Sequence, residues 1–506
     1  MRHRALRYLF AAAGGALWAV HFARQPLSVS SWIALSPLLL LFSFRESGRL
    51  AFVHGFVGWM VAVSWIPRTL VTFGQIPLPG AIPLTALLAA YLAGFQAVFG
   101  WLGGPIWRRW PVARLFLLPA LWVALEWLRT YLISGFPWNL AAYSWVDVPG
   151  ALPLAAWIGP YGVSFLVVLT SAGAAVAVER RRWEPAILCC LVPLLLLPLA
   201  GRWSVRRSAA EMAAANGVDG VGGLGVPVRL LQPDIPNLAA WDPVAVIKNY
   251  QKVIRLSMAH CEPGTLVVWP ESAAWPFQYG RDKNLDEDLR WMVERGCTVL
   301  FNSTFPAGDS SYNSAFLVAP GGTVERYDKR HLVPFGEYVP FHGFFGIVDK
   351  LAREAGAFRA GERAVLLPWG REKLGMSICY EIVFPDEVAE LTRAGATILV
   401  TITNDAWYGD TAAPWQHFRA ARFRAAENRR PLLRAAITGV SAIVGPDGAV
   451  WDQIGVFEEG VLRGRIAGRK GLTPYNRLPW IVPLLCTLAA LAGAVVSRLP
   501  RELPRE

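Results

Sequence analysis

The stretch that decides the fold of the second half of the chain is LGMSICYE, residues 374–381. A short apolar run ends at Cys379, and Tyr380 and Glu381 follow directly. Runs that are apolar on both faces are typical of strands covered on both sides. Similar runs occur at VPVRLLQ (226–232), TLVVWPE (265–271), CTVLFNST (297–304), SAFLVAP (314–320), ATILVTIT (396–403) and SAIVGPDG (441–448). Helical stretches at 242–260, 284–295 and 414–430 alternate with several of them, which predicts an α/β domain with a layered sheet core.

Two further segments place reactive side chains near strand ends. In VVWPES (267–272) a predicted strand ends at Pro270 and presents Glu271 at its C-terminal edge. In RYDKRHLVPFGEYVPF (326–341) Lys329 lies in a loop, and Glu337 follows eight residues later. Taken alone, Cys379 would be a buried apolar residue, Glu271 a turn residue and Lys329 a solvated charge. Their combination, in this order, indicates a site.

Together, these three residue types suffice for acyl transfer. A thiol with an ordinary pKa of about 8.5 is mostly protonated near neutrality. A neighbouring carboxylate can act as its general base if burial raises the pKa of that carboxylate. Attack on an ester or amide carbonyl creates an oxyanion, which a fixed ammonium and the backbone N–H after the nucleophile can stabilise. The set therefore predicts acyl transfer without a histidine.

The composition places part of the chain in lipid. The chain is 54% hydrophobic with a mean hydropathy of +0.35, and only 17% of its residues are charged. Apolar residues crowd the region before about residue 200 and again 479–497. The net charge of +12 is not arranged as a basic stripe interleaved with aromatics, so we expect no nucleic-acid partner. Much of the charge lies instead in short loops between the apolar spans, which indicates that it orients the protein in a membrane.

Crossing the hydrocarbon core takes about 20 helical residues. We predict eight transmembrane spans, at 6–23, 29–44, 50–71, 81–103, 112–134, 152–177, 185–201 and 479–497. The first resembles a signal peptide in its basic start, but no clean small-residue cleavage site follows it. We interpret it as a retained anchor.

The arginines between the spans predict the orientation. With the N-terminus in the cytoplasm, three arginines fall in outer loops: Arg24, Arg68 and Arg129. Fourteen fall in inner segments: Arg2, Arg4, Arg7, Arg45, Arg49, Arg108, Arg109, Arg114, Arg180, Arg181, Arg182, Arg498, Arg501 and Arg505. This positive-inside asymmetry predicts that the catalytic domain lies outside the cytoplasm.

The predicted domain boundaries follow from these patterns. We assign residues 1–203 to a seven-helix membrane domain and the small, Gly-rich stretch 204–225 to an aperiodic linker. Residues 226–470 form the extracytoplasmic catalytic domain, and 471–506 hold the eighth span and a cytoplasmic tail. Within the fifth span, Glu126 either pairs with Arg129, which we favour, or contacts substrate.

The six cysteines show no CxxC pair and no metal spacing, so we expect no metal site. Three lie in apolar spans and three in the globular part. Cys261 and Cys297 leave two interpretations, a disulfide and two buried free thiols, of which we expect the free thiols.

The segments WPES, DKRHLVPFGEYVP and ICYE resemble the three signature segments of the nitrilase/carbon–nitrogen hydrolase superfamily, whose Glu–Lys–Cys triad has this order. The later run TNDAWYGDTAAPWQHFRAARFRAAENRRPLLRAAITGVSAIVGPDG (403–448) is also similar to that superfamily. With spans before and after, the whole chain resembles the apolipoprotein N-acyltransferases. The resemblance implies a nitrilase-like αββα sandwich joined to a polytopic α-helical membrane domain.

The resemblance also implies residue roles, position by position. Cys379 would be the nucleophile, Glu271 the base and Lys329 the oxyanion stabiliser. The residues that would support the site are Glu337, Tyr380 and Glu381. The residues that we place at the substrate are Trp241, Asn404, Trp407, Tyr408, Phe341, Phe344 and Phe345. The last three belong to an apolar segment, 338–358, for which we weigh a mobile lid against a packed helix.

The reaction implied has two steps and needs no metal or organic cofactor. Cys379 takes an acyl chain from a phospholipid, typically phosphatidylethanolamine, as a thioester. The α-amino group of the diacylglyceryl-cysteine of an apolipoprotein then accepts it, as the last step of lipoprotein maturation. The location implied is the bacterial inner membrane, with the site on the periplasmic side.

The main alternative is a membrane-tethered carbon–nitrogen hydrolase, an amidase that releases acyl groups to water. A transporter with an accessory domain would show polar residues throughout its spans. A lipid-binding protein with an inactive nitrilase fold would lack the intact triad.

Overall fold

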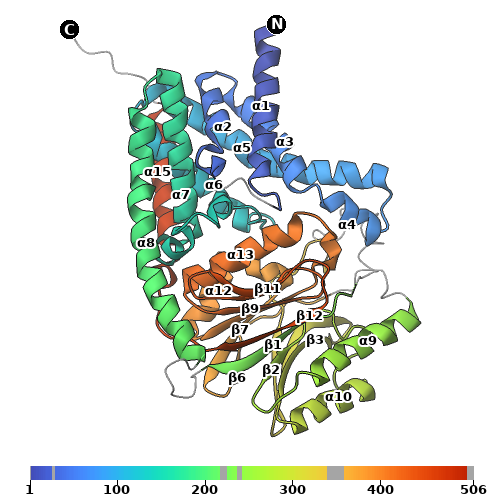
Figure 1. Ribbon diagram of the computed structural model, residues 1–506. Coiled ribbons are helices and arrows are strands. Elements are labelled where there is room, and N and C mark those ends of the chain that lie inside the picture. Colours follow the sequence, from blue (N-terminus) through green and yellow to red (C-terminus); the bar gives the residue numbers. More distant parts are fainter. Residues whose placement is uncertain (1, 25–28, 217–224, 236–241, 339–357, 499–506) are drawn as a thin grey trace, which may run out of the picture. The chain divides into compact units, whose positions relative to one another are not determined.

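The computed structural model describes residues 2–24, 29–216, 225–235, 242–338 and 358–498 (Figure 1). Its chain divides into two compact units. The first comprises Met1–Val71, Gln75–Arg202 and Leu478–Glu506, and the second Thr72–Gly74 and Trp203–Arg477. We describe each unit by itself.

The first unit is helical. Its α-helices are α1 (Arg2–Val20), α2 (Ser36–Leu40), α3 (Ser47–Ala62), α4 (Ile66–Thr72), α5 (Leu78–Arg109), α6 (Arg114–Tyr131), α7 (Ala151–Arg180), α8 (Glu184–Asn216, whose end belongs to the second unit) and α15 (Ile481–Val496). Its 3₁₀ helices are η1 (Ser30–Ile33), η2 (Leu41–Ser43) and η3 (Ala141–Trp145).

Each predicted span falls on helical structure, but the count of eight is not confirmed. Among the described residues, three helical stretches are long and apolar enough to cross a membrane: Leu78–Arg109, Ala151–Arg180 and Glu184–Arg202. A fourth is added if α3 and α4, bent by 49° at their junction, form one span. The predicted span 29–44 is divided among η1, α2 and η2, so it is not one continuous helix.

A buried, largely non-helical segment follows α6, and two charged side chains of α6 bind its backbone. Oε1 of Glu126 accepts a hydrogen bond from the backbone N–H of Ala141 at 2.7 Å. The guanidinium of Arg129 donates to the carbonyl of Trp138 at 2.9 Å. Non-helical backbone inside a membrane unit needs such partners, because lipid offers none. Glu126 and Arg129 thus organise this segment, a role that neither of our two interpretations of Glu126 included.

The second unit contains two six-stranded sheets. The first has the order β12-β1-β2-β3-β4-β5 and the second β11-β10-β9-β8-β7-β6. The first-sheet strands are β1 (Val226–Gln232), β2 (Leu266–Val268), β3 (Thr298–Ala307), β4 (Ser310–Ala319), β5 (Thr323–Asp328) and β12 (Gly460–Ile466). The second-sheet strands are β6 (Leu366–Trp369), β7 (Glu372–Ile378), β8 (Ile398–Thr403), β9 (Leu432–Ala436), β10 (Ser441–Val444) and β11 (Val450–Ile454).

The two sheets pack face to face, with helices outside. Leu266 and Val268 of β2 lie in one apolar cluster with Met376 of β7 and Val400 of β8. The side chain between them, Val267, points to the other face, into a second cluster with residues of two helices. This alternation follows from the period of two along a strand. It confirms the αββα sandwich (Figure 1).

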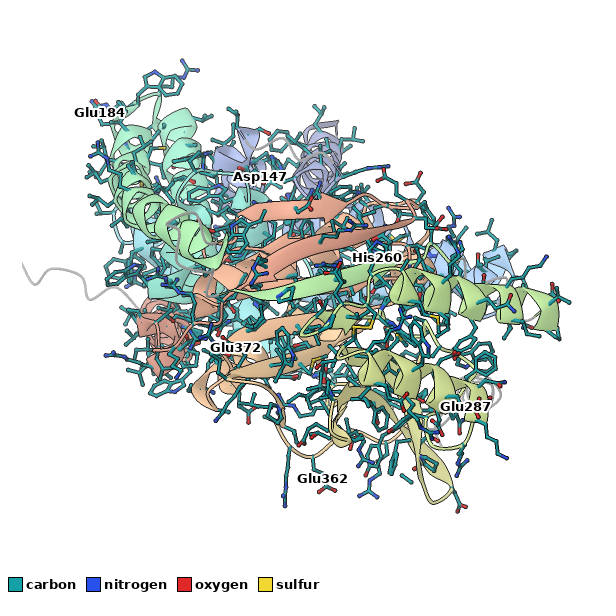
Figure 2. All side chains as sticks on the ribbon, turned by 60° about the horizontal axis from the view of Figure 1, so that its bottom comes forward. Asp147, Glu184, His260, Glu287, Glu362 and Glu372 are labelled. Atoms are coloured by element: carbon teal, nitrogen blue, oxygen red, sulfur yellow. A yellow bond between two sulfur atoms is a disulfide. The ribbon has the colours of Figure 1, made fainter. Side chains whose placement is uncertain are left out.

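The helices of this unit cover the outer faces of the sheets. Those beside the first sheet are α9 (Pro243–Met258) and α10 (Lys283–Glu294). Those beside the second sheet are α12 (Pro385–Arg393) and α13 (Ala413–Asn428). The amphipathic pattern of α10 explains its placement: Leu285, Leu289 and Met292 are buried, whereas Glu287 is exposed and points outward (Figure 2). The remaining short helices are η5 (Cys379–Val383), η6 (Asp405–Tyr408) and α14 (Pro474–Arg477).

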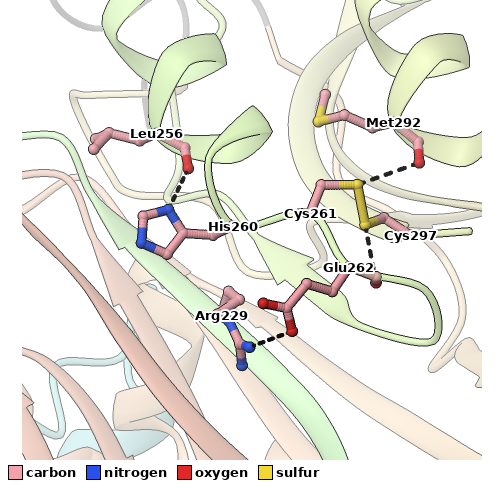
Figure 3. Close-up of a disulfide and its surroundings, with 7 residues drawn as sticks. All are labelled: Arg229, Leu256, His260, Cys261, Glu262, Met292 and Cys297. Atoms are coloured by element: carbon pink, nitrogen blue, oxygen red, sulfur yellow. Dashed lines mark hydrogen bonds and ion pairs between the residues drawn. A yellow bond between two sulfur atoms is a disulfide. The ribbon is translucent and has the colours of Figure 1, made fainter. Parts of the chain in front are cut away.

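Two expectations about connecting segments were wrong. Residues 204–225 are not aperiodic throughout, because α8 continues to Asn216. We interpreted the small residues of this stretch as a linker. Alanine has the highest helix propensity, however, so the alanine-rich run AAEMAAA (209–215) favours a helix. In addition, Cys261 and Cys297 are not two free thiols but form a disulfide (Figure 3).

The register of two parallel strands explains the disulfide. Cys261 precedes β2 and Cys297 directly precedes β3, and Leu266 pairs with Thr298. The loops before the two strands therefore meet, and the Cα atoms of the cysteines lie 5.8 Å apart. Glu262, next to the bridge, forms an ion pair with Arg229 of β1 at 3.0 Å.

We expect the C261S/C297S double variant to unfold more easily. The bridge joins residues 36 apart in the sequence. A disulfide that closes a loop of this length constrains the unfolded chain, so its loss should lower the free energy of unfolding by about 4 kcal/mol. Thermal denaturation in detergent measures the change. Adding a reductant to the wild-type protein should reproduce it and should not shift the double variant. Equal midpoints for all samples would contradict a stabilising bridge.

Candidate functional site

Two strands of the first sheet bring a carboxylate and an ammonium to the same end of that sheet. β2 pairs in parallel with β3, and two antiparallel pairings follow, β3 with β4 and β4 with β5, so β2 and β5 run in the same direction. Glu271 follows β2 by three residues and Lys329 follows β5 directly. The ends of parallel strands share one edge of a sheet, so the two side chains converge. Both are buried, with 6% and 1% of their surface exposed.

The ammonium of Lys329 lies between two carboxylates. Its Nζ is 2.8 Å from Oε1 of Glu337 and 3.6 Å from Oε1 of Glu271. Asn313 of β4 donates to the same two oxygens, at 2.9 and 3.0 Å. Burial alone would lower the pKa of Lys329, but the charges of Glu337 and Glu271 outweigh it and raise that pKa. The lysine therefore stays charged, and the carboxylates stay in fixed positions around it.

The second sheet supplies the thiol. Cys379 follows the last residue of β7 and begins η5, with a backbone φ of +53°. This left-handed conformation costs a non-glycine residue roughly 1–2 kcal/mol, and such strain is concentrated at functional sites. Our sequence interpretation ended the strand at Cys379 itself and did not foresee this turn.

The charges around Cys379 set its protonation. Burial raises the pKa of the Cys379 thiol, the charge of Glu271 raises it further, and Lys329 opposes both. The thiol is therefore protonated at neutral pH and needs a base at the moment of attack. Glu271 is also tied to the second sheet, because its Oε2 accepts the backbone N–H of Asn404 at 3.0 Å. The three residues of the predicted triad are thus brought together from both sheets.

Glu381 connects the nucleophile turn to the lysine loop. Its Oε1 accepts from the hydroxyl of Tyr327 at 2.8 Å and from the backbone N–H groups of Arg330 and His331 at 2.6 and 3.2 Å. Its Oε2 accepts from the N–H of Ile378 at 2.6 Å. This carboxylate therefore fixes the residues beside both Lys329 and Cys379, as a supporting residue should.

The other predicted residues have different placements. The Tyr380 ring lies 5.2 Å, centroid to centroid, from that of Phe384, and so packs beside the nucleophile turn. Asn404 is buried, whereas Trp407 is 42% exposed and 4.4 Å from the ring of Phe73, which belongs to the same unit. Tyr408 lies with its ring 6.2 Å from that of His417. Four predicted substrate residues fall outside the described residues, as does nearly all of the predicted lid: Trp241, Phe341, Phe344 and Phe345.

Sequence reasoning missed the amides that hold the base. Asn302 of β3 donates to Oδ1 of Asn313 at 2.7 Å, and its own Oδ1 accepts the N–H of Ser272 at 2.9 Å. Both asparagines are buried. Asn302 directly follows the apolar run 299–301, and a buried amide beside such a run requires polar partners, which was the available signal.

Replacing Glu271 with glutamine should change both the pKa of Cys379 and the rate of acyl transfer. The charge of Glu271 raises the pKa of the thiol, so removing that charge should shift the pH dependence of alkylation by iodoacetamide to lower pH. Acyl transfer should fall by about 10²–10⁴-fold, because the general base is lost. Parallel alkylation and acyl-transfer assays on E271Q measure both. An acyl-transfer rate in E271Q close to that of the wild type would show that Glu271 is not the base of this thiol.

Comparison with known proteins agrees with this division of the chain. Residues 14–173 match the family described as the apolipoprotein N-acyltransferase N-terminal domain, and residues 228–474 match the carbon–nitrogen hydrolase family. The chain is 34% identical to the apolipoprotein N-acyltransferase of Geobacter metallireducens, over 97% of this chain and 95% of that protein. It is 31% identical to that of Shewanella oneidensis, over 97% and 95%.

A solved CN-hydrolase superfamily protein from Xanthomonas campestris is similar over 48% of this chain and 91% of its own, with 18% identity and a TM-score of 0.37. The relatives of known sequence, in contrast, match across both units. On the strength of that nearly full-length identity, the chain belongs to the apolipoprotein N-acyltransferase family.

Proposed function

We propose that this chain transfers a fatty acyl chain from a phospholipid, through a thioester on Cys379, to the α-amino group of the diacylglyceryl-cysteine of an apolipoprotein. The relatives' names support the acceptor class and the N-acylation. The observation that carries the mechanism is the buried Glu271–Lys329 pair, in electrostatic contact with the strained Cys379.

In the first half-reaction, Sγ of Cys379 attacks the ester carbonyl of the phospholipid and its proton passes to Glu271. The ammonium of Lys329 stabilises the oxyanion. The carbon–oxygen bond to glycerol then breaks, and the glycerol oxygen takes the proton from Glu271. A thioester remains on the protein and a lysophospholipid leaves.

In the second half-reaction, the neutral amine of the lipoprotein attacks the thioester carbonyl. A carbon–nitrogen bond forms and the carbon–sulfur bond breaks. The proton of the amine returns through Glu271 to Sγ, which restores the resting thiol. This ping-pong sequence needs only groups of the protein and its two substrates.

We further propose that eight spans hold the chain in the bacterial inner membrane, with residues 226–470 on the periplasmic side. The arginine asymmetry of the inner and outer segments supports this orientation. The Cys261–Cys297 disulfide supports it independently, because disulfides persist in oxidising compartments and are rare in the cytosol. Trapping thiols in intact cells with a membrane-permeant alkylating reagent tests this: the two cysteines should be protected, whereas alkylated cysteines would place the domain in the cytoplasm.

We propose phosphatidylethanolamine as the acyl donor. Both substrates are anchored in lipid, and extracting a chain into water costs about 0.8 kcal/mol for each methylene exposed. A membrane-embedded enzyme avoids that cost.

The deciding experiment has two stages. The purified protein is first incubated with phosphatidylethanolamine vesicles, and the peptide that contains Cys379 is examined for an added acyl mass. A diacylated lipopeptide with a free amine is then added, and the acyl group should move to that amine. Release of free fatty acid without amide formation would instead indicate the membrane-tethered hydrolase.

A further inference from the structure

A buried histidine lies directly behind the nucleophile turn. Nε2 of His417, on α13, is 3.1 Å from the carbonyl oxygen of Cys379. The side chain of His417 is fully buried. The contact falls on the backbone of the strained residue itself rather than on its thiol.

The chemistry of this contact fixes the tautomer of His417. A carbonyl oxygen only accepts hydrogen bonds, so Nε2 must carry a hydrogen. Nδ1 lies 3.2 Å from a guanidinium nitrogen of Arg434 and 3.1 Å from Oδ1 of Asp405. Burial, followed by the charge of Arg434, lowers the pKa of His417, and Asp405 opposes this shift without reversing it. The imidazole is therefore neutral, and its Nδ1 accepts from Arg434.

The imidazole in turn has a rigid support. Oδ2 of Asp405 pairs with the guanidinium of Arg434 at 2.6 Å, and both side chains are fully buried. Oδ1 of Asp405 accepts from the hydroxyl of Thr403 at 2.8 Å, and Nε of Arg434 donates to the carbonyl of Val440 at 3.0 Å. The ion pair and these hydrogen bonds together fix the position of His417.

We propose that His417 is a positioning residue that locks the peptide between Cys379 and Tyr380. Because that peptide is planar and trans, its C=O and N–H point in opposite directions. Holding the carbonyl toward His417 therefore directs the Tyr380 N–H away from it, and keeps Cys379 in the left-handed conformation that orients Sγ. This inference deepens the proposed function and rests on Cys379 being the nucleophile.

Two substitutions separate this role from simple packing. The side-chain amide of glutamine reaches about as far as Nε2 and can donate to the carbonyl of Cys379. The shorter amide of asparagine reaches only the position of Nδ1. H417N should therefore lower the rate of acyl-thioester formation by about 100-fold, as misplacement of a reacting group by about 1 Å typically does. H417Q should retain at least about a tenth of the wild-type rate, since it keeps the donor.

Single-turnover acylation with phosphatidylethanolamine vesicles measures both variants, and thermal midpoints show how far each is destabilised. The KM for phospholipid should stay within about twofold of wild type, because the positioning acts on the reacting atoms rather than on the lipid. If H417N does not fold, H417M, which has a similar volume and no donor, replaces it in the comparison with H417Q.

Two outcomes would overturn the inference. One is a wild-type acylation rate in the variant without the donor. The other is an equal loss of rate in the two variants, in proportion to their stability. The C379A variant is assayed alongside: if C379A still N-acylates, the proposed function fails, whereas an inactive C379A with a fully active H417N removes only the role of His417.

Discussion

Replacing Cys379 with alanine should abolish both the acyl-protein intermediate and the N-acylated product. Loss of the nucleophile from a concerted acyl-transfer set lowers kcat by on the order of 10⁶, so the residual rate should be undetectable. Glu271 and Lys329 remain in C379A but have no atom on which an acyl group can rest. Intact-protein mass spectrometry and a lipopeptide assay measure the two species.

The fold should tolerate this change. Cys379 is buried at the beginning of η5, and removing one sulfur atom leaves the hydrogen bonds of Glu381 in place. A thermal midpoint close to that of wild type would show that the loss is chemical. The matched control is C190S, which removes a half-buried thiol of the first unit and should leave activity unchanged. N-acylation by purified C379A would refute the thioester mechanism.

The second large effect is expected for K329M. Without the ammonium, the oxyanion loses a stabilising group, which typically lowers kcat by about 10²–10³-fold. The carboxylates of Glu271 and Glu337, which both face the lysine, are then left buried without a cation. Removing one partner of a buried charge cluster destabilises a protein by about 3–5 kcal/mol. K329M should therefore lose both activity and stability.

A surface lysine provides the comparison. Lys252 of α9 pairs with Glu459 at 3.0 Å, and both side chains are partly exposed. K252M should change the free energy of unfolding by less than about 1 kcal/mol, because water already screens such a pair. Denaturant titration and the single-turnover assay test the two variants together. Similar small effects for K329M and K252M would show that the buried cluster does not hold Lys329 as described.

The sequence predicted the core of the sandwich because its central strands are nearly continuous apolar runs. The runs around Val267 and Met376 stand out in this way, and both proved to be strands. The edge strands β5, β6, β11 and β12 were missed, and so was the buried central strand β9. The polar residues of β11 and β12 face solvent and resemble turns. Strand propensity is read from the segment itself, whereas an edge strand forms because it pairs with a neighbouring strand.

The triad could be predicted because each member adjoins a recognisable strand end or signature segment. The disulfide could not, because nothing near Cys261 shows that β2 pairs in parallel with β3. The roles of Asn313 and His417 were missed for a related reason. Their partners, Glu271 and Cys379, are respectively 42 and 38 residues away. Contacts of this kind depend on register and docking, which local pattern does not encode.

The division of the site between the two sheets has a consequence for biogenesis. Base and ammonium belong to one sheet and the thiol to the other, so neither half of the sandwich can react by itself. A chain still emerging into a lipid-rich surrounding would carry a thiol that is inert toward the esters around it. Only the docking of the two sheets assembles the reactive set. Under the proposed mechanism, a chain whose two sheets have not yet docked therefore cannot deacylate the phospholipids around it.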